Sequence, residues 1–177
     1  MDAKAWQKQG LAHYEAGAYI KAIDAFAEAR TAYEEIGDSA NAAEMLNNQG
    51  VAYRMLQKWS KAEESFAAAR EQFKHLGDSG RAAQAVANMG MLCNARGKIK
   101  QAQAYLEEAT SLFAAQGDRQ RESDTRRALS LAFFRQRRFM DALAAYSAAL
   151  DCAPRLSLGQ RLLRRLFALP LRLLAGE

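Results

Sequence analysis

The chain has 177 residues, with 25 Lys or Arg against 20 Asp or Glu and a formal net charge of +5. This length fits one ordinary domain with a core of its own, and the few prolines and the lack of alternating β-branched runs argue against a β-sheet protein. Cys93 and Cys152 are too few and too far apart for a disulfide framework. The start, Met1 to Lys4, has no apolar segment typical of a signal peptide, so we expect a cytoplasmic protein.

A pattern of small and large apolar residues recurs every forty positions. Four columns show it: Gly10, Gly50, Gly90 and Ser130; Ala22, Ala62, Ala102 and Ala142; Ala29, Ala69, Ala109 and Ala149; Phe26, Phe66, Leu106 and Tyr146. A fixed period held over four copies indicates stacked supersecondary units, each of which buries its apolar face against a neighbour.

Within one copy, Ala62, Phe66 and Ala69 are spaced by four and three residues, which places them on one face of a helix. We therefore expect pairs of antiparallel helices, because the turns between them are only two or three residues long. Gly17 and Gly37 are predicted to end helices. In chain order the expected helices cover 3–16, 19–36, 40–57, 59–76, 80–96, 99–116, 119–137 and 139–152.

The fourth copy departs from the pattern and leads into a basic amphipathic segment. Ser130 replaces the glycine, Arg137 stands where Gly17 stands, and Pro154 ends the last helix of the copy. A further helix is predicted over 156–174, with arginines on one side and a broad leucine face on the other. Its candidate contact residues are Leu158, Arg161, Leu162, Arg164, Arg165, Leu166, Phe167 and Arg172.

Three roles remain open for this last helix. It can cap the fourth copy, it can contact a second copy or a partner, or it can lie on an anionic membrane surface. The C-terminal third is strongly basic, since residues 118–177 hold twelve arginines against six acidic residues. A transmembrane span is disfavoured because arginines lie near the middle and Pro170 interrupts the helix.

The repeated residues resemble the tetratricopeptide repeat. Gly50 with Tyr53 matches its helix A, and Ala62, Phe66 and Ala69 match its helix B. The resemblance implies an all-α, right-handed superhelical solenoid of antiparallel helix pairs. We expect four repeats in residues 1–153, at about 1–38, 39–78, 79–118 and 119–153, followed by a C-terminal amphipathic helix in 154–177. The forty-residue period resembles the longer class of such repeats.

The resemblance also implies where a partner binds, because helix A of each repeat lines the concave groove. Asn48 and Asn88 are expected to hold the backbone of an extended peptide. The other expected groove residues are Gln7, Leu11, Tyr14, Val51, Arg54, Gln84, Met91, Asn94, Arg127, Leu131, Phe134 and Arg135. An acidic end of the ligand near Arg127 and Arg135 follows as a hypothesis. The alternative is that these polar residues only keep the helices hydrated.

Enzymatic chemistry finds little support in the sequence. His13 shares a column with Tyr53, Cys93 and Phe133, which predicts a packed core imidazole rather than a base or a ligand. No spacing of His and Cys suggests a metal site, and no Gly-rich loop suggests a phosphate-binding cofactor site. We therefore expect no catalytic residues, no metal and no cofactor. Nucleic acid is a weak candidate, because no aromatic stacking platform accompanies the arginines.

Two functions from different classes follow. The first is a protein-interaction scaffold or adaptor, not an enzyme, that holds a peptide or helix of another protein in the groove of the A helices. The alternative is an assembly or membrane-recruitment factor that acts through the Arg- and Leu-rich C-terminal helix, either as a homo-oligomer or at the periphery of a membrane.

Overall fold

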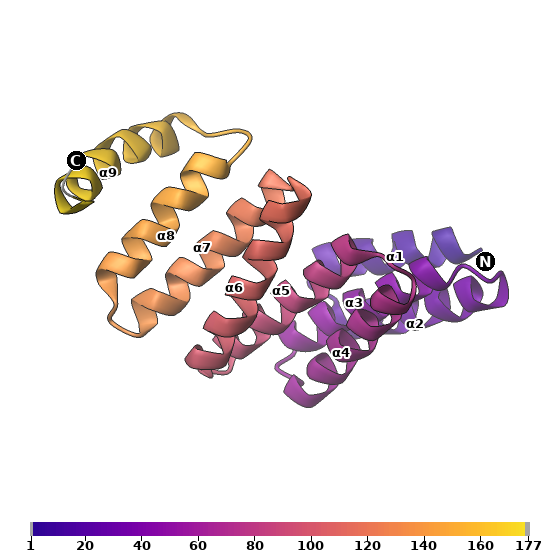
Figure 1. The fold of residues 1–177 in the computed structure, drawn as a ribbon. Helices are drawn as coiled ribbons and strands as arrows, with labels where there is room; N and C mark the ends of the chain where they lie inside the picture. The colour runs from indigo at the N-terminus through magenta and orange to yellow at the C-terminus, as the bar shows by residue number, and fades with distance from the viewer. Residues whose placement is uncertain (1, 176–177) are drawn as a thin grey trace. The chain divides into compact units, whose positions relative to one another are not determined.

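The computed structural model describes residues 2–175, with side chains as far as Leu166, and this part of the chain is all α-helical with no β-strand. Figure 1 shows the helices in order: α1 (Ala3–Glu15), α2 (Tyr19–Glu35), α3 (Ser39–Met55), α4 (Trp59–His75), α5 (Ser79–Ala95), α6 (Ile99–Gln116), α7 (Arg119–Arg135), α8 (Phe139–Cys152) and α9 (Leu158–Ala175). Each expected helix is present, with bounds that differ by about two residues or fewer. The chain forms two compact units, an N-terminal unit (Met1–Leu92) and a C-terminal unit (Cys93–Glu177), with the boundary inside α5.

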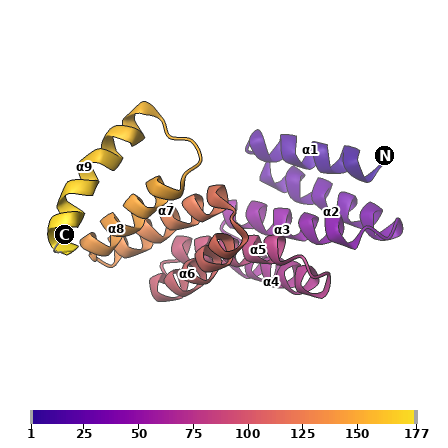
Figure 2. The same ribbon diagram turned by 45° about the horizontal axis from the view of Figure 1, so that its top comes forward.

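In the N-terminal unit, consecutive helices pack antiparallel against one another (Figures 1 and 2). One core cluster joins Phe26 and Tyr33 of α2 to Met45 of α3, and a second joins Leu46 of α3 to Phe73 of α4. Met45 and Leu46 are neighbours in sequence and project about 100° apart around the helix. Helix α3 therefore contributes to two apolar contacts at once, which explains why so many of its residues are buried.

The turns between helices place one residue in the left-handed region of φ. Most of these residues are glycines, for example Gly37 with a φ of 75°, but Gln57 and Arg137 adopt φ values of 57° and 59°. Asp38 caps the start of α3, since its carboxylate accepts the backbone N–H of Asn41 over 3.1 Å. Glycine, glutamine and arginine therefore all adopt the left-handed conformation at turns of the repeats.

The C-terminal unit packs α6 against α7 and α7 against α8. Leu106, Phe113 and Leu150 are almost fully buried in its core. Ser130, which replaces the glycine of the earlier copies, is tolerated because its Oγ donates to the carbonyl oxygen of Ala142 over 2.8 Å. A hydrogen bond between α7 and α8 takes the place of the close helix contact that a glycine permits.

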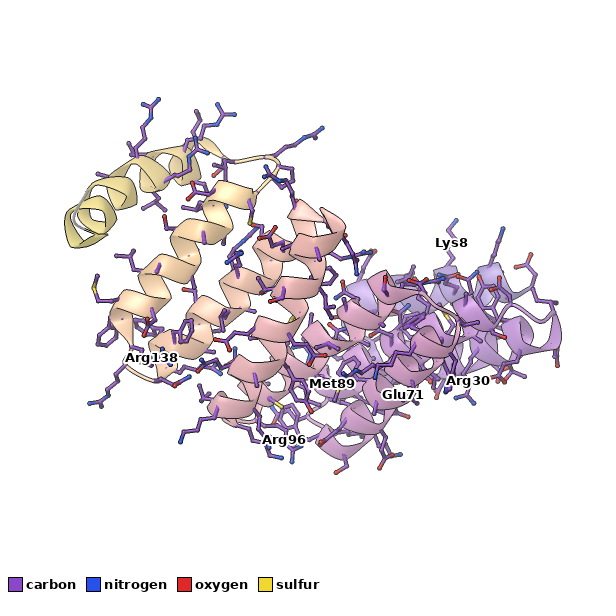
Figure 3. The ribbon with its side chains drawn as sticks, viewed as in Figure 1. Lys8, Arg30, Glu71, Met89, Arg96 and Arg138 are labelled. Atoms are coloured by element: carbon purple, nitrogen blue, oxygen red, sulfur yellow. The ribbon has the colours of Figure 1, made fainter. Side chains whose placement is uncertain are left out.

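The turn between α7 and α8 carries Arg138, which is labelled in Figure 3. Its guanidinium carbon lies 4.6 Å from the centroid of the Phe133 ring, and its Nε lies 2.7 Å from Oδ2 of Asp141. These two contacts hold the first turn of α8 beside α7.

Helix α9 follows a short extended connection that begins at Ala153. Its start is capped reciprocally, since the backbone N–H of Ser157 donates to Oε1 of Gln160 and the backbone N–H of Gln160 donates to Oγ of Ser157. Contact between α9 and α8 is sparse compared with the other neighbouring pairs of the unit. In Figures 1 and 2, α9 is the outermost helix of this unit, with α8 on one side only.

Candidate partner-binding surfaces

One apolar column of the A helices (α1, α3, α5 and α7) is not buried. The column consists of Leu11, Val51, Met91 and Leu131, each directly after the glycine or serine of its repeat. Leu11 and Leu131 are 43% and 46% exposed, and Val51 and Met91 are half-buried. We call these four residues the A-helix column. It is apolar in every copy although none of its members joins the core.

The expected groove residues of α1 are partly committed to contacts within the N-terminal unit. The Oε1 of Gln7 accepts the hydroxyl of Tyr33 over 2.5 Å. The ring of Tyr14 packs against that of Tyr19, with centroids 5.5 Å apart. Both Gln7 and Tyr14 are half-buried, so each presents only part of its side chain to a ligand.

The two asparagines expected to hold a peptide differ from each other. Asn88 is buried, and its Nδ2 donates to Oδ1 of Asn47 over 2.8 Å, which ties α5 to α3. Asn48 is half-buried and forms no side-chain hydrogen bond with the described part of the chain. Asn48 therefore has an amide available to a ligand, whereas the amide of Asn88 serves the contact between repeats.

Arg54 and Gln84 are half-buried residues of α3 and α5. The Nε of Arg54 is shielded from solvent and has no acceptor among the described residues. Since this atom has no exposed surface, a ligand cannot reach it in this arrangement of the side chain, and only the outer part of Arg54 is available to one.

In the C-terminal unit, the polar residues expected in the groove form hydrogen bonds or ion pairs within the unit. Asn94 is buried, its Nδ2 donates to the carbonyl oxygen of Ala128 over 3.2 Å, and its own carbonyl oxygen accepts Nη1 of Arg135. Arg127 lies 2.9 Å from Oδ1 of Asp124. Both arginines keep other N–H donors for an acidic ligand, but the charge of Arg127 is balanced by Asp124, whereas Arg135 donates to a neutral carbonyl oxygen.

Aromatic residues at the α7–α8 turn form an exposed patch. Phe134 is 59% exposed, and its ring meets that of Phe139 edge-on, with centroids 5.4 Å apart. Phe139 and Met140 are also more than half exposed, and neither was expected at a site.

The leucines of α9 are largely exposed. Leu158, Leu162 and Leu166 are 84%, 61% and 55% exposed, whereas Leu163 is 37% exposed. Arg161, Arg164 and Arg165 are exposed, and no carboxylate among the described residues pairs with them. We call Leu158, Leu162, Leu166 and these three arginines the α9 surface. Phe167 and Arg172, also expected here, lie outside the residues whose side chains are described.

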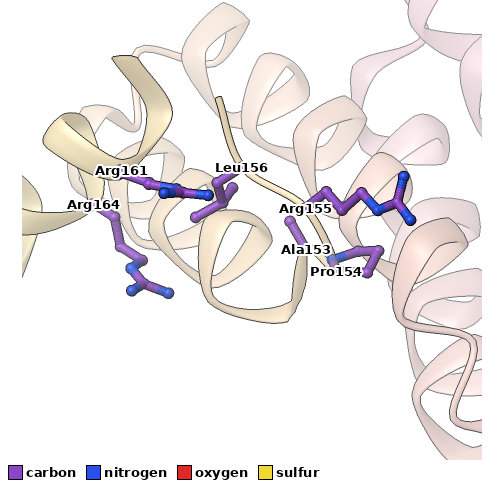
Figure 4. Close-up of a pocket in the computed structure, with 6 residues that line it drawn as sticks. All are labelled: Ala153, Pro154, Arg155, Leu156, Arg161 and Arg164. Atoms are coloured by element: carbon purple, nitrogen blue, oxygen red, sulfur yellow. The ribbon is translucent and has the colours of Figure 1, made fainter. Parts of the chain in front are cut away.

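Beside the α8–α9 connection there is an open hollow of about 600 Å³. It is lined by Ala153, Pro154, Arg155, Leu156, Arg161 and Arg164 (Figure 4). In Figure 4 the three guanidinium groups point in different directions and do not converge on one point. The hollow is therefore positively charged without forming a closed cradle for a single anion.

The titratable groups do not assemble a reactive centre in the described part of the chain. Between residues 2 and 175, no group of three or more His, Cys, Asp or Glu could hold a metal ion. Burial raises the pKa of the Cys152 thiol, and the nearby Glu122 adds to this effect, so Cys152 stays in its unreactive protonated form. His13 is half-buried rather than packed in the core as the sequence predicted, and its Nε2 lies 3.5 Å from Nε2 of Gln9.

Comparisons with known proteins agree with this architecture. Residues 2–75 match the model of the tetratricopeptide repeat family. No curated protein matches the chain. Among solved structures, the chain is similar to the crystal structure of BtubC (BKLC) from P. vanneervenii, with a TM-score of 0.73 and 22% sequence identity over 88% of this chain and 68% of that chain. At this identity the likeness shows the fold. Within the described residues, no helix is long and apolar enough to cross a bilayer.

Proposed function

Because residues 2–75 belong to the tetratricopeptide repeat family and the same helix pairing continues to Cys152, we propose that this protein is a non-catalytic scaffold for another protein. Repeats of this family generally mediate protein–protein interaction. The proposed ligand is a peptide or a helix of the partner, held on the outward faces of the A helices.

The A-helix column is the observation that supports this proposal. A repeat protein is stabilised by apolar residues that neighbouring helices bury, and here that role belongs to columns such as Phe26 and Phe66. Leu11, Val51 and Met91 of the N-terminal unit contribute less to burial, yet each is apolar, and Leu131 has the same character in the C-terminal unit. Partly exposed apolar residues that recur on successive helices of one unit are typical of an interaction surface.

Polar groups beside the column would set the direction and the register of the ligand. Asn48 of the N-terminal unit has a side-chain amide available to a ligand. In the C-terminal unit, Arg127 and Arg135 would favour an acidic ligand, although each also has a partner within the unit. We therefore propose a ligand with apolar anchors for the N-terminal unit and an acidic segment for the C-terminal unit.

The test uses peptides selected from a random display library against the full chain. Their affinity is then measured by fluorescence anisotropy for the wild type and for a variant with Leu11→Ser, Val51→Ser and Met91→Ser. We expect the variant to lose roughly tenfold or more in affinity, since buried apolar anchors carry much of the energy of such interfaces. The matched control replaces exposed apolar residues in or directly after α2 and α4 of the same unit, through Ile20→Ser, Ile36→Ser and Leu76→Ser. Unchanged affinity in the first variant would contradict the proposed surface.

A second candidate function is favoured by the exposure of the α9 surface. We propose that α9 recruits the protein to an assembly or to a membrane, with the repeats as the attached body. Sparse contact with α8 leaves Leu158, Leu162 and Leu166 without a partner in this unit. Light scattering on the full chain and on a version ending at Pro154, with and without anionic vesicles, tests this function. Association of the full chain alone would support it, whereas two non-associating monomers would argue that α9 is only a cap.

A further inference from the structure

The exposed leucines of α9 form one continuous stripe. Leu158, Leu162 and Leu166 follow each other at intervals of four residues, which keeps them on one side of the helix. Leu163 projects about 100° away from Leu162 and is the least exposed of these leucines, consistent with a position toward α8. The stripe therefore lies beside the contact with α8 and is open to an occupant.

The charge next to the stripe is purely positive. From Cys152 to Gly176 the sequence contains five arginines and no acidic residue. Arg161 and Arg165 lie directly beside the leucine stripe on the helix surface, and their guanidinium groups have no carboxylate partner among the described residues. The occupant of the stripe must be apolar and anionic at once. Pairing of α9 with α9 of a second copy would instead bring arginines of like charge together.

The orientation of the arginines indicates what kind of anion they meet. Around the hollow in Figure 4, the guanidinium groups of Arg155, Arg161 and Arg164 point in different directions. A single phosphate cannot contact all three in this arrangement. An extended array of phosphates can, because each guanidinium then finds its own partner.

From these observations we infer that α9 lies in the surface of an anionic membrane. Leu158, Leu162 and Leu166 enter the boundary between headgroups and acyl chains, while Arg161 and Arg165 bind lipid phosphates beside them. Arg155 adds a further phosphate contact at the start of the helix. A lipid surface provides both an apolar layer and the phosphates that lie above it, along the length of the helix. This inference rests on the second candidate function and names its partner.

The size of the expected effect follows from the number of contacts. An arginine near an anionic surface contributes about fivefold in partitioning, so loss of Arg161 and Arg165 should weaken binding about 25-fold. The effect should shrink as salt is added, because the attraction is screened beyond the Debye length. Loss of the three leucines should abolish binding even at low salt, since charge alone does not hold the helix in the boundary.

The experiment is co-sedimentation of the full chain with vesicles of phosphatidylcholine alone and of equimolar phosphatidylcholine and phosphatidylserine. Two variants test the two kinds of contact: Arg161→Gln with Arg165→Gln, and Leu158→Ser with Leu162→Ser and Leu166→Ser. The control lowers the net charge equally in the same unit, through Lys98→Gln and Lys100→Gln. All five substituted α9 positions are exposed, so circular dichroism should show that each variant remains folded.

We expect the wild type and the control to sediment with the serine-containing vesicles only, and both α9 variants to stay in solution. No sedimentation of the wild type, or equal loss in the control, would overturn the inference. Competition by soluble glycerophosphate at low concentration would also overturn it in favour of a single-phosphate site. Light scattering on the same samples distinguishes failure of the lipid partner from failure of the second candidate function. A dimer or a protein complex that depends on Leu158, Leu162 and Leu166 without vesicle binding would retain the second candidate function and reject the lipid partner.

Discussion

A β-carbon added to Gly50 would lie 2.6 Å from Cε1 of Phe66, a separation that real side chains do not tolerate. Gly10 stands in the same relationship to Phe26, again with 2.6 Å to the ring. The glycine of helix A and the large residue of helix B are therefore one packing unit, repeated along the chain. Phe66 fills the space that the missing side chain of Gly50 leaves, which is why both columns recur with the same period.

The Gly50–Phe66 contact predicts that Gly50→Ala destabilises the N-terminal unit. Overpacking of this kind costs about 1–3 kcal/mol, and the better helix propensity of alanine offsets about 1 kcal/mol of it. We expect a net loss of up to about 2 kcal/mol, measured by urea unfolding. Gly159→Ala is the control, because a β-carbon there meets no atom within 4 Å. Addition of Phe66→Leu should recover part of the loss, and no recovery would contradict this explanation.

Arg137 occupies a left-handed turn position, and its replacement by glycine is predicted to increase stability. Arg137 has a φ of 59°, at the position where Gly17 and Gly97 stand in other copies. A residue with a β-carbon is strained there by about 1 kcal/mol, so Arg137→Gly should raise the free energy of unfolding by a similar amount. Thermal unfolding checks it. Gly97→Ala, the reverse change at the equivalent turn, should lower the melting temperature, and equal effects of the two changes would contradict the strain argument.

The bond between Asn88 and Asn47 predicts a stability effect rather than a binding effect. Because Asn88 is buried and donates to Asn47, we expect Asn88→Ala to cost about 1–2 kcal/mol of unfolding free energy. A double-mutant cycle with Asn47→Ala should show a coupling of about 1 kcal/mol. Asn48→Ala should leave stability nearly unchanged and weaken the selected peptides instead. The opposite outcome, with Asn88 affecting only binding, would restore the sequence-based role of Asn88 as a ligand contact.

The lowered pKa of Asp38 predicts that stability decreases at acidic pH. The backbone N–H of Asn41 lowers the pKa of Asp38 below 3.8, and the side-chain amide of Asn41 adds to this, with smaller contributions from Arg81 and Lys4. Since the folded state holds the proton less tightly, the stabilisation is present above pH 3.8 and is lost as the pH falls through the lowered pKa. In Asp38→Asn, which keeps an N-cap oxygen, unfolding midpoints in urea should fall less steeply in this acidic range. A slope equal to that of the wild type would exclude this contribution.

The two sides of α9 predict different costs for leucine truncation. Leu163 is 37% exposed, and Leu158 is 84% exposed. Leu163→Ala should therefore destabilise the C-terminal unit by about 1 kcal/mol, which is less than a core truncation because the contact with α8 is partial. Leu158→Ala should change stability by less than about 0.5 kcal/mol. Calorimetric melting separates the two, and equal losses would mean that α9 packs more closely than its exposure indicates.

The forty-residue period by itself determined the helices, their antiparallel pairing and the positions of most core residues, although His13, predicted in the core, is half-buried. This was possible because Phe66 against Gly50, or Ala62 with Ala69 on one face, depend on spacing within one repeat. What only the tertiary structure decided is which residues near the edge of each A helix remain available. Asn48 and Asn88 occupy the same column, yet only Asn88 meets a partner across the repeat boundary. Such contacts depend on the rotation and separation of helices from different repeats, which no single repeat encodes. The same holds for α9, whose amphipathic pattern is evident in the sequence. The exposure of its leucines depends on how the connection after Pro154 directs the helix along α8.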